Sequence, residues 1–258
     1  MRADQLVLSR GLAPTRSAAQ RLIDRGAVER RSAAGWEALR KAGEELADHV
    51  ELRVSDAAEL RWVSRAGLKL EGALTHTGIA VNDALCLDVG QSTGGFTEVL
   101  LAAGAKKVVG VDVGHGQLHP KLREHPQVKA FEGLNARELN RIALKGALPS
   151  RFKGFDLIVG DLSFIPLPLV LAPLAKLLAP TGTLLMLVKP QFELQPKDIG
   201  KGGLVKHAAS YTEVEHKLRA AVAALGLQVI DYFESAIAGG DGNREFFIRA
   251  QPDAGSNE

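Results

Sequence analysis

The chain has 258 residues, of which 46% are hydrophobic and 24% are charged, a balance that excludes a disordered or fibrous protein. Its net charge of +2 indicates no partner by itself, because a nucleic-acid-binding protein can concentrate its basic residues in one segment. One cysteine, Cys86, excludes an internal disulfide, and no apolar run reaches the roughly 18–20 residues of a membrane span, so we expect a cytoplasmic protein.

The N-terminal segment is predicted to form a small α+β domain. A first helix is expected over Gln5–Arg10, and a second begins after Thr15, whose hydroxyl can cap it, and stops at Gly26. Short strands are expected around Ala27–Arg30 and His49–Val54. The length of the chain leaves room for one full catalytic domain beside this small one.

Arginines are concentrated in this segment, with seven of them against three acids in residues 1–31. Arginines alone are compatible both with RNA contacts and with a solvated helix face. The run Thr15–Val28, however, resembles the S4-type RNA-binding domain, whose helix pair presents arginines to RNA phosphates. The resemblance departs at Glu29-Arg30-Arg31, where that family usually continues with Val-Asn-Gly, so we expect an irregular strand there. The implied RNA contacts are Arg2, Arg10, Arg16, Arg21, Arg25 and, beyond the helices, Arg65.

Residues 59–63 are predicted to be a linker, residues 64–250 a second domain, and the polar residues 251–258 a disordered tail. In the second domain, short apolar runs alternate with helical stretches such as Phe96–Ala103 and Ser210–Leu225. This alternation predicts an α/β fold, a mostly parallel sheet covered by helices on both faces. The expected strands are Leu85–Val89, Val108–Val113, Val128–Glu132, Phe155–Gly160, Thr183–Val188, Gln228–Phe233 and Glu245–Arg249.

The run Cys86–Phe96 comprises the end of the first of these strands, a glycine-rich turn and the start of a helix. Glycine is needed where the backbone takes a positive φ or closely approaches a ligand, and open parallel sheets bind ligands at the carboxyl ends of their strands. A purely structural turn is one alternative. A nucleotide redox cofactor is another, but its Gly-x-Gly-x-x-Gly fingerprint is absent, because position 92 is Ser92 and Gly95 follows Gly94 directly.

The next strand favours S-adenosylmethionine as the ligand of this turn. It ends in Asp112, whose carboxylate can accept hydrogen bonds from both hydroxyls of a ribose, and Asn135 follows the third strand, where it can contact an adenine edge. Asp88 would either face the amino-acid end of the cofactor or brace the turn. The predicted cofactor contacts are Asp88, Gly90, Ser92, Thr93, Gly94, Gly95, Phe96, Asp112, Asn135 and Asp161.

Charged residues also recur at or near the same edge of the predicted sheet. Lys69 precedes the first strand, Asp161 and Lys189 end the fourth and fifth, and Glu245 begins the last. Each one alone is compatible with a solvated strand boundary. Their joint placement beside a cofactor turn indicates a catalytic group.

These residues match the Lys-Asp-Lys-Glu tetrad of FtsJ-like ribose 2′-O-methyltransferases. The strings Trp62–Arg65, Ser92–Leu100 and Lys189–Phe192 are similar to the TlyA family, which joins an S4-type domain to an FtsJ-like domain. The resemblance covers nearly the whole chain and implies an S4-like domain followed by a Rossmann-like class I methyltransferase with a seven-stranded sheet. It also implies methylation of a cytidine 2′-hydroxyl in ribosomal RNA. The early first helix resembles the shorter members, which act on the large subunit only.

The chemistry of methyl transfer to a hydroxyl agrees with these residue types. We expect Lys189 to be the base that removes the hydroxyl proton, since burial and a nearby cation can lower the pKa of a lysine. Lys69 would be the second cation, and Asp161 and Glu245 would orient both ammonium groups. No metal is expected. Gln91 stands where many family members have a small residue, so contacts near the methionine end are expected to differ.

Other functions stay open at this point. The complete tetrad disfavours a protein that binds RNA and S-adenosylmethionine without turnover, and a small-molecule methyltransferase would leave the arginine-rich segment without a purpose. Family members also carry the name hemolysin, yet no cationic amphipathic helix with an aromatic face supports membrane activity. Residues 192–210 are either a mobile loop over the substrate or an irregular surface segment. His115 and His119 are not expected to bind zinc, and the chain is expected to be a monomer or a homodimer.

Overall fold

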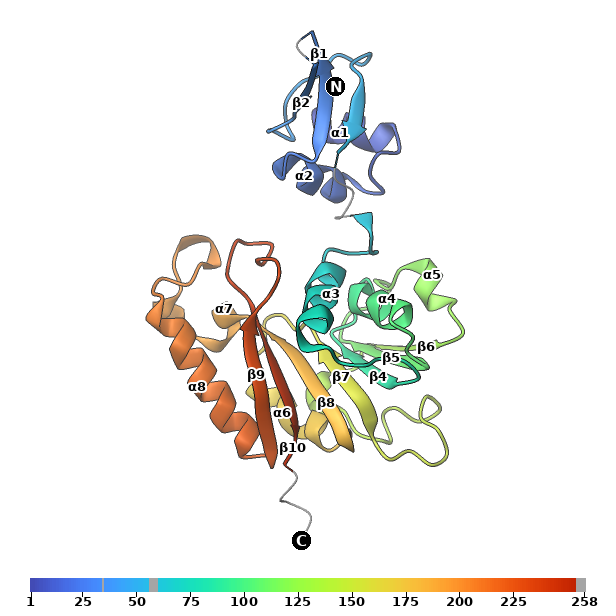
Figure 1. The fold of residues 1–258 in the computed structure, drawn as a ribbon, viewed down its shortest axis with the longest axis vertical. Coiled ribbons are helices and arrows are strands. Elements are labelled where there is room, and N and C mark those ends of the chain that lie inside the picture. The colour runs from blue at the N-terminus through green and yellow to red at the C-terminus, as the bar shows by residue number, and fades with distance from the viewer. Residues whose placement is uncertain (34, 56–59, 254–258) are drawn as a thin grey trace. The chain divides into compact units, whose positions relative to one another are not determined.

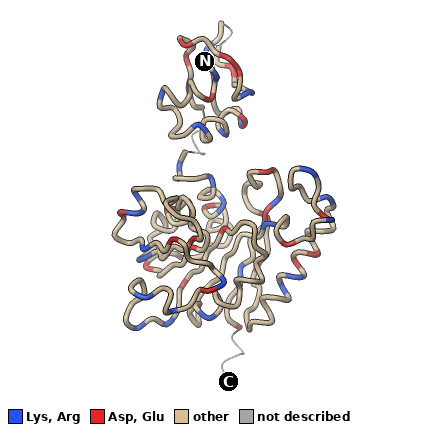
Figure 2. The backbone as a smooth tube through the Cα atoms, turned by 180° about the vertical axis from the view of Figure 1, so that it is seen from behind, with Lys and Arg blue, Asp and Glu red and all other residues tan. Residues whose placement is uncertain are grey.

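The computed structural model describes residues 1–33, 35–55 and 60–253, which divide into two compact units, Met1–Arg65 and Ala66–Glu258 (Figure 1). The predicted linker, 59–63, lies at this division, with residue 59 outside the described residues. Basic and acidic residues are interspersed along the backbone of both units (Figure 2).

The first unit packs two helices, α1 (Ala3–Ser9) and α2 (Arg16–Asp24), with a sheet of order β2-β1-β3. The predicted cap of α2 is present, because the Ala18 N–H donates to Thr15 Oγ1 at 3.1 Å. The strands are β1 (Val28–Ser32), β2 (Gly35–Ala38) and β3 (Leu52–Val54).

The expected irregularity of β1 was wrong. Glu29 pairs with Ala38 on one side and with Arg53 on the other, and the antiparallel register continues through Arg30. A central strand in a small sheet needs only one apolar face, and Val28 is fully buried in the core of the unit, so the polar residues after it are tolerated. The strand β2 was not predicted, since its four residues do not show a clear alternation of apolar and polar side chains.

The second unit contains a seven-stranded sheet of order β6-β5-β4-β7-β8-β10-β9, in which β10 runs antiparallel to both of its neighbours (Figure 1). This confirms the predicted seven-stranded, mostly parallel α/β fold. The strands are β4 (Leu85–Val89), β5 (Lys107–Asp112), β6 (Val128–Glu132), β7 (Phe155–Gly160), β8 (Leu178–Val188), β9 (Leu227–Glu234) and β10 (Phe246–Pro252). Because β10 reaches Pro252, the prediction of a disordered tail was wrong for residues 251 and 252; residues 254–258 lie outside the described part.

Helices cover both faces of this sheet. Adjacent residues of β10 show this directly: the Phe247 ring lies 6.3 Å from Phe96 of α4, whereas the Phe246 ring lies 5.5 Å from Tyr211 of α8. Successive side chains of a strand point to opposite faces, so α4 and α8 lie on opposite sides. The helices are α3 (Ala66–Thr77), α4 (Gly95–Ala102), α5 (Pro120–Arg123), α6 (Pro168–Ala175), α7 (Pro190–Glu193) and α8 (Ala209–Ala223), with 3-10 turns η2 (Ala136–Glu138), η3 (Pro196–Asp198) and η4 (Lys201–Gly203).

Candidate active site

The structure brings all members of the predicted tetrad together at the carboxyl edge of the parallel strands. Asp161 directly follows β7 and Lys189 follows β8, while Glu245 precedes β10, whose antiparallel direction places its start at the same edge. Lys69 reaches this edge from α3. Its Nζ lies 2.6 Å from Glu245 Oε2 and 3.7 Å from Asp161 Oδ2, and Lys189 Nζ lies 2.5 Å from Asp161 Oδ1. The charges therefore alternate along one chain of contacts, from Glu245 to Lys69 to Asp161 to Lys189.

This chain of charges is shielded from solvent. Side-chain exposure is 8% for Lys69, 3% for Glu245, 15% for Asp161 and 11% for Lys189. Burial raises the pKa of Glu245, and the adjacent Lys69 ammonium opposes that rise. Buried ions persist when they are paired, and each of the two cations and two carboxylates here lies within 3.7 Å of an opposite charge.

Ser163 is a member of the site that the sequence analysis missed. Lys189 Nζ donates a hydrogen bond to Ser163 Oγ at 2.8 Å, so the lysine is held between a carboxylate and a hydroxyl. The position of Ser163, two residues after Asp161, was the sequence signal that could have identified it. The next residue, Phe164, is 88% exposed and has a φ of 63°, a conformation that is strained for a bulky side chain and is often found at functional sites.

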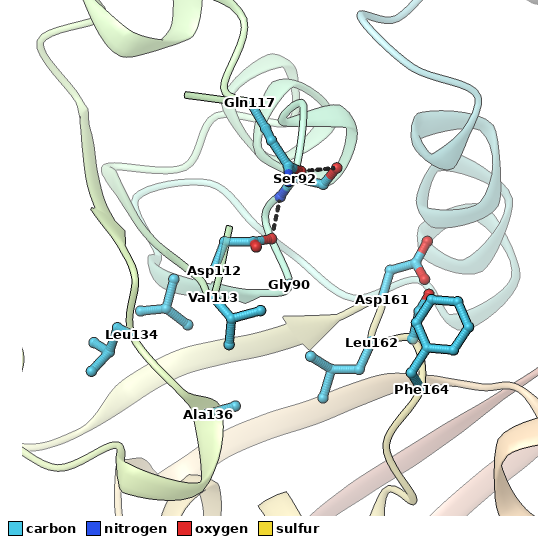
Figure 3. A pocket seen from close by; sticks show the side chains of 12 residues that line it. Gly90, Ser92, Asp112, Val113, Gln117, Leu134, Ala136, Asp161, Leu162 and Phe164 are labelled. Atoms are coloured by element: carbon cyan, nitrogen blue, oxygen red, sulfur yellow. Dashed lines mark hydrogen bonds between the residues drawn. The ribbon is translucent and has the colours of Figure 1, made fainter. Parts of the chain in front are cut away.

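A pocket of about 310 Å³ opens beside the tetrad, at the ends of β4, β5 and β7 (Figure 3). Asp112 lines it, and its carboxylate oxygens accept 2.7 Å hydrogen bonds from the backbone N–H groups of Ser92 and Gly114. Ser92 Oγ also donates to Gln117 Oε1 at 3.1 Å. Of the predicted cofactor residues, the lining includes Gly90, Ser92, Asp112 and Asp161, together with apolar or polar neighbours Val111, Val113, Gln117, Leu134, Ala136, Leu162, Ser163 and Phe164.

Gly90 joins the pocket to the tetrad. It has a φ of 81°, and a Cβ built on it would lie 2.6 Å from the carbonyl oxygen of Asp161. A larger residue would therefore force the glycine-rich turn away from the carboxylate-bearing loop.

Other residues of the glycine-rich turn determine the conformation of the turn but do not line the pocket. Gly94, with a φ of 95°, is the N-cap of α4, and Gly95 begins that helix. The Phe96 side chain is buried and stacks near Phe247, and a cofactor contact of this residue stays a prediction. Thr93 is exposed, its carbonyl accepts the His119 N–H, and a cofactor contact there stays a prediction.

Asp88 stabilises the glycine-rich turn through hydrogen bonds, which is one of the two roles considered for this residue. Thr97 Oγ1 donates to Asp88 Oδ2 at 2.7 Å, and Gln91 Nε2 donates to Thr97 Oγ1 at 2.8 Å, all three residues being buried. The Gln91 side chain also covers Gly110, where a Cβ would lie 2.0 Å from it. Gln91 is thus turned into the protein, and Asp88 Oδ1 is buried without a hydrogen-bond partner.

The burial of Asp88 predicts a pH dependence of stability. Burial raises the pKa of Asp88 to about 7, against the lowering effect of the Thr97 hydrogen bond, whereas an unfolded aspartate titrates near about 3.9. The folded state thus holds this proton more tightly, so the carboxyl favours folding below about pH 4 and this contribution is lost as the pH rises to about 7. Relative to the wild-type protein, Asp88→Asn should gain free energy of unfolding between about pH 4 and pH 7.

Urea unfolding across this pH range measures the difference, with the exposed Asp83→Asn as the matched control. A constant difference between Asp88→Asn and wild type at every pH would contradict the raised pKa.

Asn135 lies beside the pocket but not in its lining. Its Oδ1 accepts the Arg137 N–H at 3.0 Å and caps η2, while its neighbours Leu134 and Ala136 line the pocket. The amide oxygen is therefore engaged by the backbone, and an adenine contact stays a prediction.

Arginines predicted to contact RNA hold the first unit together. Arg2 Nε and Arg16 Nε donate to the two oxygens of Asp4, at 3.1 and 2.9 Å, and Asp4 is fully buried. Hydrogen bonds from Arg2, and then from Gln20 and Arg16, hold the pKa of Asp4 well below its usual range despite burial. Arg10 donates to the backbone carbonyls of residues 48 and 50. These arginines have structural roles, while Arg21 is half-buried on α2, Arg25 is exposed at its end and Arg65 ends the unit.

The segment of residues 192–210 folds back on the loop before Glu245. Buried Asn243, which the sequence analysis did not single out, donates from Nδ2 to the Gly203 carbonyl at 2.9 Å and accepts the Val205 N–H at 3.0 Å. The segment is thus hydrogen-bonded at the active edge, and its motion stays a prediction.

Two features are absent from the part of the chain that the structure describes. Among residues 1–33, 35–55 and 60–253, no three His, Cys, Asp or Glu side chains gather as a metal site would require. In the same part of the chain, no helix has both the length and the apolar character to cross a membrane.

Comparisons with known proteins agree with this geometry. The sequence profile of the FtsJ-like methyltransferases matches residues 62–251. The chain is 40% identical to the 16S/23S rRNA (cytidine-2′-O)-methyltransferase TlyA of Mycobacterium tuberculosis, over 98% of this chain and 91% of that protein. It is 36% identical to the 23S rRNA (cytidine-2′-O)-methyltransferase TlyA of Campylobacter jejuni, over 72% of this chain and 69% of that protein.

A solved structure is also similar to this chain. The Streptococcus thermophilus protein, named as a candidate hemolysin, aligns with a TM-score of 0.75 and 37% identity, over 98% of this chain and 89% of that chain. The chain therefore belongs to the FtsJ-like methyltransferase family, among the relatives named TlyA.

Proposed function

We propose that this protein transfers a methyl group from S-adenosylmethionine to the 2′-hydroxyl of a cytidine in ribosomal RNA. The observation that carries the proposal is the alternating chain of charges, ending at Lys189, beside a pocket whose lining includes Asp161 and Ser163. The carboxylate and the hydroxyl fix the position of the lysine beside this pocket, where its uncharged amine can remove a proton from an incoming hydroxyl.

The pocket residues fit S-adenosylmethionine, which supplies the methyl group when bound. Asp112 stands at the end of β5, where its remaining lone pairs can accept hydrogen bonds from the ribose hydroxyls. Val113, Leu134 and Ala136 offer an apolar wall to adenine, on the side of the pocket away from Asp161 (Figure 3). The close contact of Gly90 with Asp161 would hold the methyl donor next to the tetrad.

Each charged residue then has a role in the transfer. Lys189, in its uncharged amine form, would accept the proton of the ribose hydroxyl as the oxygen attacks the methyl carbon and the carbon–sulfur bond breaks. Asp161 contacts both lysines and fixes their separation, and Lys69 provides the second positive charge, itself held by Glu245. Holding oxygen, methyl carbon and sulfur in line is expected to supply much of the acceleration.

Ribosomal RNA is proposed as the substrate because the relatives in Mycobacterium tuberculosis and Campylobacter jejuni are named as ribosomal RNA methyltransferases. We further propose that the first unit is an S4-like RNA-binding domain and that the large subunit is the target. The exposed ring of Phe164, at the pocket, is suited to stack on an unpaired base. Such a substrate implies a cytoplasmic protein.

The contribution of the first unit to RNA binding is testable through its salt dependence. We expect Arg21→Gln/Arg25→Gln to weaken binding to ribosomal RNA and to reduce the slope of log K against log salt by about 1.4–1.8, as loss of two phosphate contacts requires. Arg16 is unsuitable for this test, since its loss also removes a contact to buried Asp4.

Filter binding at several salt concentrations measures the slope, and the exposed Arg151→Gln of the second unit is the control. An unchanged slope in the double variant would show that α2 does not contact phosphates.

The proposed function itself is tested by transfer of tritiated methyl from S-adenosylmethionine to isolated small and large ribosomal subunits, to naked ribosomal RNA and to transfer RNA. We expect label in ribosomal RNA and most of it in the large subunit. Binding of both ligands without transfer would instead support a non-catalytic protein, and label only in small molecules would reject RNA as the substrate.

A further inference from the structure

Two loops of the active edge are joined by successive contacts, of which only the first involves the tetrad. Loop 161–167 follows β7, and segment 189–193 follows β8. Lys189 bonds to Ser163, the Phe192 ring lies 4.9 Å from Phe164, and the Glu193 carboxylate accepts the Leu167 N–H at 2.5 Å.

The last of these contacts is the most deeply buried. The Glu193 side chain is 2% exposed, and Leu167 is buried at the start of α6, where a helix favours a nearby negative charge. Lys217 Nζ, from α8, donates to the Glu193 carbonyl at 2.9 Å and to Oε2 at 3.3 Å. A buried carboxylate is costly unless it is paired, and here both oxygens have partners.

Glu193 is rigidly connected to Lys189 through the single turn of α7. Lys189 is the N-cap of this helix and Glu193 its last residue. The Phe192 N–H donates to the Lys189 carbonyl at 2.9 Å, and Pro190 restricts the backbone at the first helical position. A shift of Glu193 would therefore move the backbone that carries Lys189.

We propose that Glu193 is a positioning residue for methyl transfer: its carboxylate ties loop 161–167 to α7 and thereby sets Lys189 against Ser163 and Phe164 against the pocket. This inference rests on the proposed function. The hydrogen bonds of Glu193 to Leu167 and Lys217 reach neither the pocket lining nor the tetrad, so its effect on the reaction is exerted through the loops.

Matched variants separate positioning from general stability. Glu193→Met has a similar volume and suits an apolar environment, but it cannot accept the Leu167 N–H. Glu193→Gln keeps an acceptor oxygen for that bond. Lys217→Met removes the cation that pairs with Glu193 while the bond to Leu167 can persist, so it serves as the control for lost stability.

We expect Glu193→Met to lower kcat at saturating RNA at least about tenfold, consistent with a displaced general base, while the Kd for S-adenosylmethionine changes less than about threefold. Glu193→Gln should recover kcat to within about threefold of wild type, and Lys217→Met should also stay within about threefold. A kcat for Glu193→Met within twofold of wild type would overturn the proposal, as would an equal loss in Lys217→Met.

A crystal structure of Glu193→Met gives a readout that does not depend on activity. We expect the separation of Lys189 Nζ and Ser163 Oγ, 2.8 Å here, to exceed hydrogen-bonding range. Retention of that contact would overturn the positioning role. If the wild-type protein methylated no RNA, the proposed function would fail, and this structural comparison would still decide whether Glu193 sets the two loops.

Discussion

Replacing Lys189 with alanine is expected to reduce methyl transfer by roughly 100- to 10,000-fold, the range of a lost general base, and to leave the affinity for S-adenosylmethionine nearly unchanged. The affinity should persist because Lys189 is not part of the pocket lining. Its Nζ instead contacts Asp161 and Ser163, at 2.5 and 2.8 Å.

Lys189→Arg sharpens this test. Arginine keeps the positive charge beside Asp161, but a guanidinium stays protonated and cannot accept the hydroxyl proton. We expect it to be nearly as inactive as alanine, whereas Lys176→Ala, at an exposed position after α6, should be fully active. Rates are measured by single-turnover methyl transfer, and Lys189→Arg with more than about a tenth of wild-type activity would contradict the role of base.

Replacing Lys69 with methionine should cost both activity and about 3–5 kcal/mol of stability. The reason is the 2.6 Å contact of Lys69 with Glu245, in which both side chains are almost fully buried. Removing the cation leaves a buried carboxylate without its partner. Adding Glu245→Gln to Lys69→Met removes that charge as well, so the double variant should regain much of the stability and none of the activity.

The measurement is urea unfolding followed by circular dichroism, alongside methyl transfer. Lys121→Met is the control, because it breaks an ion pair with Glu98 in which the lysine is 55% exposed, and such pairs contribute about 1 kcal/mol or less. A double variant as unstable as Lys69→Met, or one that regains methyl transfer, would contradict this account of the pair.

The fold of the second unit was largely predictable because its signals are local. The inner parallel strands β4, β5, β7 and β8 are largely buried and appear as short apolar runs. All the runs proposed from the sequence coincide with strands of the sheet. The strand β8 begins at Leu178, earlier than the expected Thr183, and its register with β7 shifts between these two residues.

The tetrad was predictable for a different reason. Lys69 and Glu245 are far apart in the chain, and only the topology of the sheet, with β10 reversed, brings them together. The residue types were visible through their likeness to a known family. Serine, glutamate and asparagine are common residue types, and their contacts could not be inferred from the sequence. Ser163, Glu193 and Asn243 were therefore missed.

The arginines show which contacts composition does not reveal. A run of basic residues predicts RNA contacts, but it cannot reveal that Arg2 and Arg16 converge on a buried carboxylate, Asp4. Likewise, the glycine-rich turn predicted direct cofactor contacts for Phe96, whose side chain is directed into the core against Phe247. Such partners are set by tertiary packing, which residue spacing does not encode.

The position of the transferred methyl group tests the central claim most directly. Large-subunit ribosomal RNA is labelled by the purified protein and tritiated S-adenosylmethionine, hydrolysed with alkali and then digested to nucleosides. Because a 2′-O-methyl group blocks alkaline cleavage of the adjacent phosphodiester, we expect the label in an alkali-resistant dinucleotide that yields 2′-O-methylcytidine. Label recovered in alkali-sensitive mononucleotides carrying a methylated base would contradict the account.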